Sequence, residues 1–413
     1  MSRVPNRSRR GFSLIELMVS LTLGLLITGA AVKLYTTGVD ATWVIQQRAE
    51  LQQDLRSAED MLIKDVSLAG AGLTTIPGES VPLPNGGAGS PVYGCSAGPV
   101  CAPNGAVNYP NIGGGGPTLY PIMPGFRLGI IPPGSVTRSD LITVVYSDNI
   151  LALNCYSGTS GGAGGATAAN NAITFNAAGN VLTFTAPVNL PSVPAGCVLP
   201  PNLAFPQALN NTVNGLQPGD LILFGPLGVQ SAVAEVTGVA PANPGNTPAA
   251  PGSQYTISFL NGDTLNMNQS GVANDLTQFA PAGGGQLAGL VANRIFVVTY
   301  YIGNWTDAAG NVTTILYRQV NGQRAIPLVD NVANLQFTYD SYDNLGNLLV
   351  QAGDAGESVG DSPNLIRKIN VIHLTVHSQL YGSKSSLMAT QGFQSFDLQT
   401  SISARNASFT NRY

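Results

Sequence analysis

Residues 12–32, FSLIELMVSLTLGLLITGAAV, decide how this chain is organised, because they form a long and mostly apolar run. As a helix rising about 1.5 Å per residue, a run of about 21 residues crosses the hydrocarbon core of a bilayer. It lacks the short apolar core and small-residue cleavage site of an ordinary secretory signal. Four basic residues and no acidic residue precede it: Arg3, Arg7, Arg9 and Arg10. The positive-inside rule therefore keeps the N-terminus in the cytoplasm and sends the rest of the chain across the inner membrane.

One acidic residue, Glu16, lies near the start of this run. A carboxylate in a membrane helix costs about 2.5–3.5 kcal/mol near the centre and less near an end, so it normally has a partner. The simplest interpretation is a plain single-pass anchor that tolerates one charge near its end. A cut after Gly11 would instead create a new α-amino group at Phe12, four residues before Glu16, which would be a suitable partner.

Residues 9–18, RRGFSLIELM, resemble the class III signal of type IV prepilins. The resemblance implies that residues 1–11 are a leader and that prepilin peptidase cuts between Gly11 and Phe12. It also implies N-methylation of Phe12. Glu16 would then neutralise the N-terminus of a neighbouring subunit in a filament.

The helix is expected to continue past the membrane, since residues 43–69 contain neither Pro nor Gly. Apolar residues recur there at spacings of three, four and seven, which predicts an amphipathic helix. These residues are Val44, Leu51, Leu55, Ala58, Leu62, Val66 and Ala69. Charged residues, Asp65 among them, occupy mostly the other positions. Gly70 and Gly72 are expected to end the helix, so that it covers residues 12–69.

The composition predicts a strand-rich body with long loops. Only 10% of the 413 residues are charged, whereas 49 Gly and 28 Pro make up nearly a fifth of the chain. Segments 77–134 and 239–252 are expected to be a surface loop and an insertion, and residues 307–311 to form a hairpin turn. Strands are expected at 141–146, 172–175, 181–185, 221–224, 232–236, 255–259, 294–302, 312–319, 335–339, 366–377 and 396–403.

The predicted fold class is therefore α+β and type IV pilin-like. A long N-terminal helix, with residues 12–32 in the membrane or filament core, packs on a mostly antiparallel β-rich head over residues 70–413. Beyond residues 1–11 there are 14 basic residues against 22 acidic ones, because four of the 18 basic residues lie in that segment. No basic patch large enough for a phosphate backbone stands out, so no direct nucleic-acid partner is expected.

Four body segments resemble the PilW group of minor pilins: 217–223 (QPGDLIL), 332–339 (VANLQFTY), 366–371 (IRKINV) and 400–406 (TSISARN). The resemblance implies a subunit that helps to initiate type IV pili and is incorporated into them, supporting twitching motility, adhesion or DNA uptake. Its implied partners are other minor and major pilins and the inner-membrane assembly machinery. Its implied location is the inner membrane with a periplasmic head, and later the pilus at the cell surface. The alternatives are a minor pseudopilin of type II secretion and a pilin-anchored adhesive or ligand-binding module.

Four cysteines, Cys95, Cys101, Cys155 and Cys197, lie beyond the helix. Disulfides persist in the periplasm, and four cysteines allow three pairings. Pairing Cys95 with Cys101 and Cys155 with Cys197 is favoured, because each pair brackets a glycine-rich loop. No metal site is expected from them, since they contain no C-x-x-C spacing and no nearby His.

His373 and His377 are predicted to share the polar face of one strand, about 13 Å apart at about 3.3 Å per residue, too far to bind one ion. The acidic residues Asp340, Asp343, Asp354, Glu357 and Asp361 are interpreted as a solvated loop, with a calcium site as the alternative. No Gly-x-Ser-x-Gly elbow and no phosphate loop with Lys occurs. We therefore expect a structural protein without a cofactor or metal, not an enzyme.

Overall fold

The structure is a computed structural model. It describes residues 12–73, 80–86, 90–93, 107–110, 116–132, 135–148, 174–176, 178–185, 209, 215–226, 231–241, 254–279, 285–286, 290–308, 310, 312–343, 347–353, 366–379 and 393–404. The chain divides into two compact units. The first, called here the stem unit, comprises Met1–Asp54 and Ser378–Gln394. The second, called the head unit, comprises Leu55–His377 and Ser395–Tyr413.

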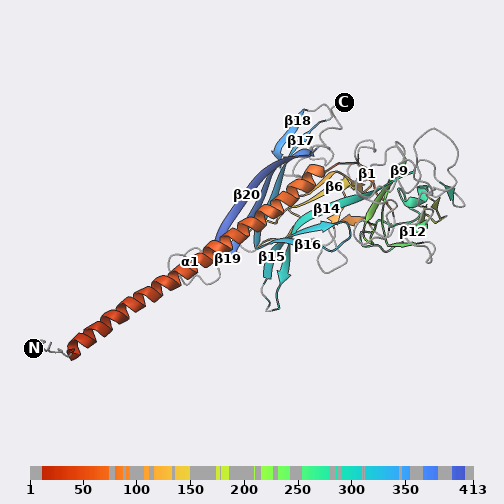
Figure 1. Ribbon diagram of the computed structural model, residues 1–413. Helices are drawn as coiled ribbons and strands as arrows, with labels where there is room; N and C mark the ends of the chain where they lie inside the picture. Colours follow the sequence, from red (N-terminus) through yellow and green to blue (C-terminus); the bar gives the residue numbers. More distant parts are fainter. Residues whose placement is uncertain are drawn as a thin grey trace, which may run out of the picture. The chain divides into compact units, whose positions relative to one another are not determined.

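The N-terminal helix is confirmed as one element, α1, which runs without interruption from Leu14 to Leu68 (Figure 1). Gly70 and Gly72 follow it with φ angles of 81° and 74°, a left-handed conformation that glycine adopts without strain. Gly72 is also required for space, because a Cβ atom there would lie 2.4 Å from Cβ of Ser147. The predicted glycine stop is therefore where the helix ends.

The part of α1 in the head unit buries the apolar stripe that the sequence predicts. Leu55, Ala58, Leu62, Val66 and Ala69 are all buried. They recur at spacings of three and four, so they lie on one face of the helix. This face covers part of the head's largest sheet, where Asp65 of α1 contacts side chains from three strands.

The largest sheet of the head has seven antiparallel strands: β5 (Ile122–Gly125), β6 (Leu141–Ser147), β9 (Leu221–Pro226), β10 (Ala232–Glu235), β14 (Leu290–Thr306), β15 (Val312–Val320) and β16 (Ile326–Asp330). β14 is its central strand. It pairs in turn with β9 over Leu290–Ile295, with β6 over Ile295–Tyr300 and with β15 over Val298–Thr306. One long strand therefore joins all other parts of this sheet.

Two further sheets complete the head. A five-stranded sheet contains β7 (Thr174–Phe175), β8 (Val181–Thr185), β11 (Gly238–Pro241), β12 (Gln254–Ser258) and β13 (Gly285–Gln286). A four-stranded sheet has the order β18 (Leu348–Gly353), β17 (Val332–Tyr342), β19 (Ile366–Gln379) and β20 (Phe393–Ser403). Two short strand pairs precede these sheets in sequence: β1 (Val81–Pro82) with β4 (Thr118–Leu119), and β2 (Val92–Tyr93) with β3 (Val107–Asn108). The 3₁₀ helix η3 (Leu276–Phe279) lies between β12 and β13.

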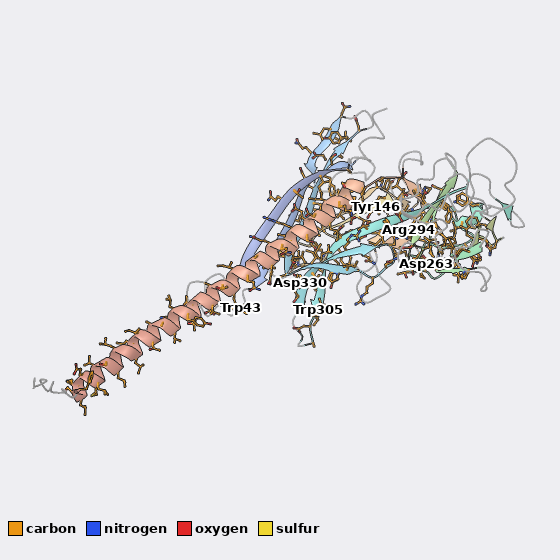
Figure 2. The ribbon with its side chains drawn as sticks, viewed as in Figure 1. Trp43, Tyr146, Asp263, Arg294, Trp305 and Asp330 are labelled. Atoms are coloured by element: carbon orange, nitrogen blue, oxygen red, sulfur yellow. The ribbon has the colours of Figure 1, made fainter. Side chains whose placement is uncertain are left out.

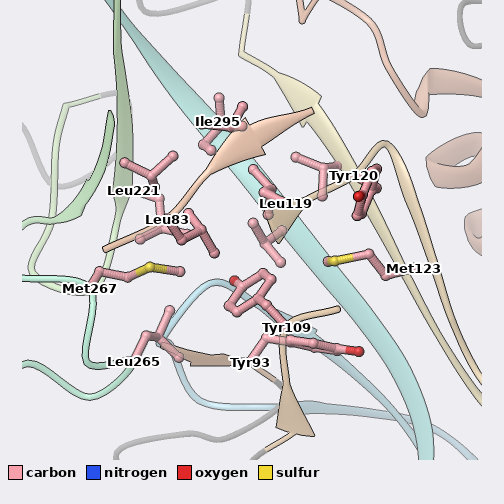
Figure 3. Close-up of a cluster of buried hydrophobic side chains, with 14 of the residues drawn as sticks. Leu83, Tyr93, Tyr109, Leu119, Tyr120, Met123, Leu221, Leu265, Met267 and Ile295 are labelled. Atoms are coloured by element: carbon pink, nitrogen blue, oxygen red, sulfur yellow. The ribbon is translucent and has the colours of Figure 1, made fainter. Parts of the chain in front are cut away.

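The two faces of the seven-stranded sheet support two different cores. Successive residues of β14 face opposite sides of the sheet, so Ile295 belongs to one core and Ala292 to the other. The first core is rich in tyrosine, and Tyr93 and Tyr109 lie there with ring centroids 4.8 Å apart (Figure 3). The second core joins Phe224 of β9 to Tyr255 and Ile257 of the five-stranded sheet. The sheet is thus covered on both faces at its β9–β10 end.

Each strand expected from the sequence falls in an observed strand, with ends displaced by a few residues. The turn at 307–311 is confirmed, since Thr306 lies opposite Val312 and Gly310 has a φ of 86°. Segment 77–134 is not wholly loop, because it contributes β1–β5, and segment 239–252 begins within β11. These strands are two to four residues long in the structure, too short for a period-two pattern to identify them.

The packing of α1 makes a prediction for neighbouring residues. Leu62→Ala removes a fully buried side chain and should destabilise the head by about 2–5 kcal/mol. Met61→Ala, one position along on the half-exposed side, should cost less than about 1 kcal/mol. Urea unfolding of the two variants in detergent measures the difference. Equal losses would show that the buried stripe does not hold the helix to the head.

Candidate functional site

The sequence motif for processing lies at the exposed start of α1. Gly11 lies outside the described residues, and Phe12 is 81% exposed, two residues before the helix begins. Glu16 is exposed in the first turn, where a negative charge interacts favourably with the helix dipole. The helix dipole accounts for a negative charge at this position but does not assign a function to Glu16. The roles of Gly11, Phe12 and Glu16 in cutting, methylation and assembly remain predictions.

The stem part of α1 has the length and composition of a membrane span. The candidate span, Leu14–Trp43, has 30 residues and a mean hydropathy of 2.0, and none of its most apolar window is buried within the protein. Three of its apolar side chains, Leu25, Ile27 and Leu34, are each more than two-thirds exposed. A bilayer or a set of other apolar helices would remove this surface from water.

The head part of α1 carries a buried charge, Asp65, at the centre of a four-residue cluster that we call the helix anchor (Asp65, Tyr146, Tyr300 and Arg318). The hydroxyl of Tyr146 donates to Oδ1 of Asp65 at 3.0 Å, and that of Tyr300 donates to Oδ2 at 2.6 Å. Nε of Arg318 lies 2.7 Å from Oδ2, and its Nη2 donates to Oδ1 at 3.3 Å. Both carboxylate oxygens are therefore satisfied twice.

The register of the sheet explains why these side chains converge. Tyr300 lies opposite Arg318 on one neighbouring strand and opposite Ile142 on the other, four residues from Tyr146. Side chains four residues apart in a strand share a face, so three strands present polar groups to one point of α1. The amphipathic pattern placed Asp65 among the charged residues of the solvent side, and this was wrong. The available signal was its spacing, three residues after Leu62 and seven after Ala58, which places it on the buried face of the helix.

The electrostatics of the helix anchor keep its two tyrosines protonated and its arginine charged. Burial raises the pKa of Tyr146 and of Tyr300 above the ordinary value, and the nearby charge of Asp65 raises both further. Burial alone would lower the pKa of Arg318, but the hydrogen bonds and charge of Asp65 raise it above the ordinary value. The tyrosines thus stay protonated and donate, while the arginine stays charged.

A second buried ion cluster surrounds Arg294 of β14, a residue labelled in Figure 2. Arg294 is six residues from Tyr300 in the same strand, so the two side chains share a face of the sheet. Its Nε donates to Asp148 at 2.7 Å and its Nη2 pairs with the same carboxylate. Its Nη1 donates to the carbonyl of Gly215 at 2.7 Å and lies 3.5 Å from Asp220. Burial raises the pKa of Asp220, which the bonds from Gln217 and the charge of Arg294 oppose.

Segment 217–223 (QPGDLIL) contains the turn that places Asp220 in this cluster. Asp220 N donates to Gln217 O at 3.0 Å, and Gly219 has a φ of 91°. Proline second and glycine third are the residues that a type II turn requires. The segment therefore makes a turn that delivers Asp220 beside Arg294. Segments 332–339 and 366–371 likewise lie in the paired strands β17 and β19, so these motifs are structural.

A third buried acid is Glu235, at the end of β10. Its Oε2 accepts from the backbone N–H of Leu265 at 2.9 Å, and Asn268 bonds to its main chain. Burial raises the pKa of Glu235 to about 8, with a further contribution from the neighbouring carboxylate of Asp263. Asp263 in turn accepts from the backbone of Met267 and Asn268. The two acids organise the loop after β12.

The remaining expected sites have different outcomes. All four cysteines, Cys95, Cys101, Cys155 and Cys197, lie outside the described residues. His373 and His377 both lie in strand β19, as expected, but their side chains are outside the described part.

The solvated acidic loop was wrong for Asp340, which is a buried residue of β17, held there because that strand is central in its sheet. Asp343 accepts two hydrogen bonds from Asn347, whereas Asp354, Glu357 and Asp361 lie outside the described residues. Among the described residues, no group of three or more His, Cys, Asp or Glu side chains is arranged to hold a metal ion.

Comparison with known proteins identifies the N-terminal segment. Residues 6–32 match the prokaryotic N-terminal methylation motif. No curated protein and no solved structure matches the chain. The matched segment contains Gly11, Phe12, Glu16 and the first part of α1. With an apolar helix followed by a β-rich head, it indicates a type IV pilin-like or pseudopilin-like protein with an α+β arrangement.

The helix anchor predicts a large penalty for removing one charge. Asp65→Asn leaves the partly buried Arg318 without a counter-ion and should destabilise the head by up to about 3–5 kcal/mol. Asp60→Asn, an exposed change of the same type on the same helix, should have little effect. Chemical unfolding followed by near-ultraviolet circular dichroism compares them. A loss below about 1 kcal/mol for Asp65→Asn would contradict a structural role for the pair.

Glu235 predicts a pH dependence of stability. Its pKa is raised in the folded state, so the folded state holds a proton that the unfolded state releases between about pH 4.5 and 8. Stability should therefore fall across this interval, by at most about 1.4 kcal/mol per pH unit. Glu235→Gln keeps an acceptor for Leu265 and should remove that slope.

The measurement is the difference in unfolding free energy between wild type and Glu235→Gln at several pH values. The difference should grow from pH 5 to pH 8. A flat difference for Glu235→Gln would show that Glu235 is ionised in the folded protein at neutral pH.

Proposed function

We propose that this chain is a minor pilin of the PilW type, a structural subunit that helps to initiate type IV pili and is incorporated into them. The PilW type rests on the resemblance of segments 217–223, 332–339, 366–371 and 400–406. The methylation motif at residues 6–32, at the start of α1, supports a pilin-like subunit. The same helix has an exposed apolar part and a part held in the head through Asp65. One element thus offers a filament surface while carrying a folded domain.

The proposed life history follows from the chemistry of the N-terminus. Before assembly the span Leu14–Trp43 holds the chain in the inner membrane, with the head in the periplasm. Prepilin peptidase cuts after Gly11, and Phe12 is methylated. The freed amino group meets Glu16 of a neighbouring subunit, which neutralises a carboxylate that is costly in an apolar setting. Major and minor pilins and the inner-membrane machinery are the proposed partners, and a pilus at the cell surface is the end state.

A structural function also fits the use of the charged side chains. The buried acids Asp65, Asp148 and Asp220 are each paired with arginine. They join α1, strands and turns to one another, which is a structural use of charge. We therefore propose no catalytic role, no cofactor and no metal.

The assembly proposal predicts that Glu16→Ala leaves processing intact but reduces entry into pili at least tenfold. The physical reason is the uncompensated N-terminal charge of the neighbouring subunit. Gly11→Ser is the matched comparison, since it should retain the leader of eleven residues and also fail to assemble. Immunoblots of membranes and sheared pili, with mass determination, separate the two defects. Normal pilus content of Glu16→Ala would overturn the assembly role, and loss of type II secretion alone would indicate a pseudopilin.

A further inference from the structure

The loop that follows β12, residues 260–275, joins two parts of the head, and we call it the strap. Asp263 fixes its turn, because the carboxylate accepts from the backbone N–H groups of Met267 at 2.7 Å and of Asn268 at 3.0 Å. Side-chain bonds to the main chain therefore order the strap, which belongs to no helix and to none of the sheets.

On one side the strap is bound to β10, the last strand in the order of the seven-stranded sheet. Asn268 accepts from the backbone N–H of Glu235 at 2.9 Å and donates to its carbonyl at 2.6 Å. The side chain of Glu235 returns the contact, since its Oε2 accepts from the N–H of Leu265 at 2.9 Å. Glu235 and Asn268 thus bind the strap to the main sheet.

On its other side the strap holds the chain segment that contains β1 and β2. The N–H of Val92 donates to the carbonyl of Leu265 at 2.9 Å. The N–H of Asn85 donates to the carbonyl of Ala273 at 3.1 Å, in an isolated antiparallel bridge. The segment is therefore attached to the strap at two points of its backbone.

The strap and this segment together cover the tyrosine-rich first core. Leu83 and Tyr93 of the segment are buried there with Leu265 and Met267 of the strap. Figure 3 shows the four side chains in one cluster. Separation of the strap from β10 would therefore loosen the cover of this core.

The contact between the strap and β10 contains two acids. Glu235 is 3% exposed, and the side chain of Asp263 is hydrogen-bonded to it. Ionised carboxylates only accept hydrogen bonds, so one of the two acids must hold a proton. Burial and the charge of Asp263 raise the pKa of Glu235 to about 8, which the backbone bonds from Thr264 and Leu265 only partly oppose. The proton therefore belongs to Glu235 at neutral pH.

The elements packed around Glu235 bring no positive charge to it. Leu221 of β9 lies opposite it, Gly322 lies against its Oε1, and neither β1 nor η3 has a charged residue. Tyr109, whose pKa is raised mainly by burial and also by the charge of Glu235, has a hydroxyl without a hydrogen-bond partner among the described residues. Loss of the proton would therefore leave two carboxylates in contact inside the head, which is costly.

We infer that the strap is a proton-operated latch: a proton shared by Glu235 and Asp263 holds residues 260–275 on β10. Loss of the proton releases the strap, together with residues 81–86 and 90–93, from the first core. In the open state both carboxylates reach water, which removes their repulsion at short range. The inference does not depend on the proposed pilus role.

The direction of the pH dependence follows from the two states. The closed latch holds a proton that the open latch releases, so closure weakens as the pH rises from about 4.5 to 8. Below this interval both states hold the proton, and the latch has its full strength. The first core would thus be covered at low pH and become accessible as the pH rises.

Hydrogen exchange of the full chain in detergent, measured by mass spectrometry from pH 6 to pH 8, tests the latch. Each rate is divided by the intrinsic rate at the same pH, so that the remaining change reports opening. Peptides with the N–H groups of Val92 and Leu265 should lose protection by up to about tenfold per pH unit. Peptides of the β14–β15 pair should stay better protected at every pH, because the sheet does not open with the latch.

Two substitutions of the same residue separate the proton from the contact. Glu235→Gln keeps an acceptor for Leu265 and offers a donor to Asp263, so it imitates the protonated acid at every pH. The protection of its strap should stay constant within about twofold from pH 6 to pH 8. Glu235→Ala removes the acceptor, so its strap should be at least about fivefold less protected than wild type already at pH 6.

Three results would overturn the latch, and the first two need no variant. Wild-type strap protection that does not change with pH would exclude the proton as its control. Strap protection equal to that of the β14–β15 pair at each pH would show that only the whole head opens. A loss of protection with pH that persists in Glu235→Gln would assign the effect to another group.

Discussion

The ion pair between Asp65 and Arg318 is the constraint on which the rest of this structure depends. It joins a helix whose other end is built for an apolar environment to a sheet built for water. A buried carboxylate and a partly buried guanidinium are costly to desolvate. The pair is tolerated because two tyrosine hydroxyls and a two-point contact with arginine satisfy the carboxylate. An apolar stripe alone allows a helix to slide or rotate on its partner, whereas this contact fixes both its rotation and its position.

The same sheet face uses charge a second time, at the boundary between its two covered regions. Near Tyr300 the face is covered by α1, and near Ala292 it packs against the five-stranded sheet. Arg294 lies between these positions, with Asp148 and Asp220 around it. The long strand β14 carries Ala292, Arg294 and Tyr300. The helix and the five-stranded sheet therefore both pack against this one strand. A force on α1 would be borne by the central strand of the head.

The sequence predicted the elements better than their contacts. The helix and its glycine stop, the hairpin at 307–311 and every long strand followed from local patterns, since each has a period or turn chemistry of its own. Asp65 was assigned to the wrong side because its partners, Arg318 and Tyr300, lie far away in sequence. Glu235 and Asp263 were not identified, because a long-range contact makes the site. Gly11, Phe12 and Glu16 were identified from the sequence motif alone. Their predicted roles involve a peptidase and a neighbouring subunit, so the structure of a single chain does not test them.

We propose that one helix is processed at its start, stored in a membrane, and then used in a filament to carry the head. The most direct measurement is the N-terminal sequence and mass of the chain recovered from sheared pili. The account predicts a chain that begins at Phe12 and carries a methyl group on its α-amino nitrogen. A chain absent from pili, or one in pili that still begins at Met1, would contradict it.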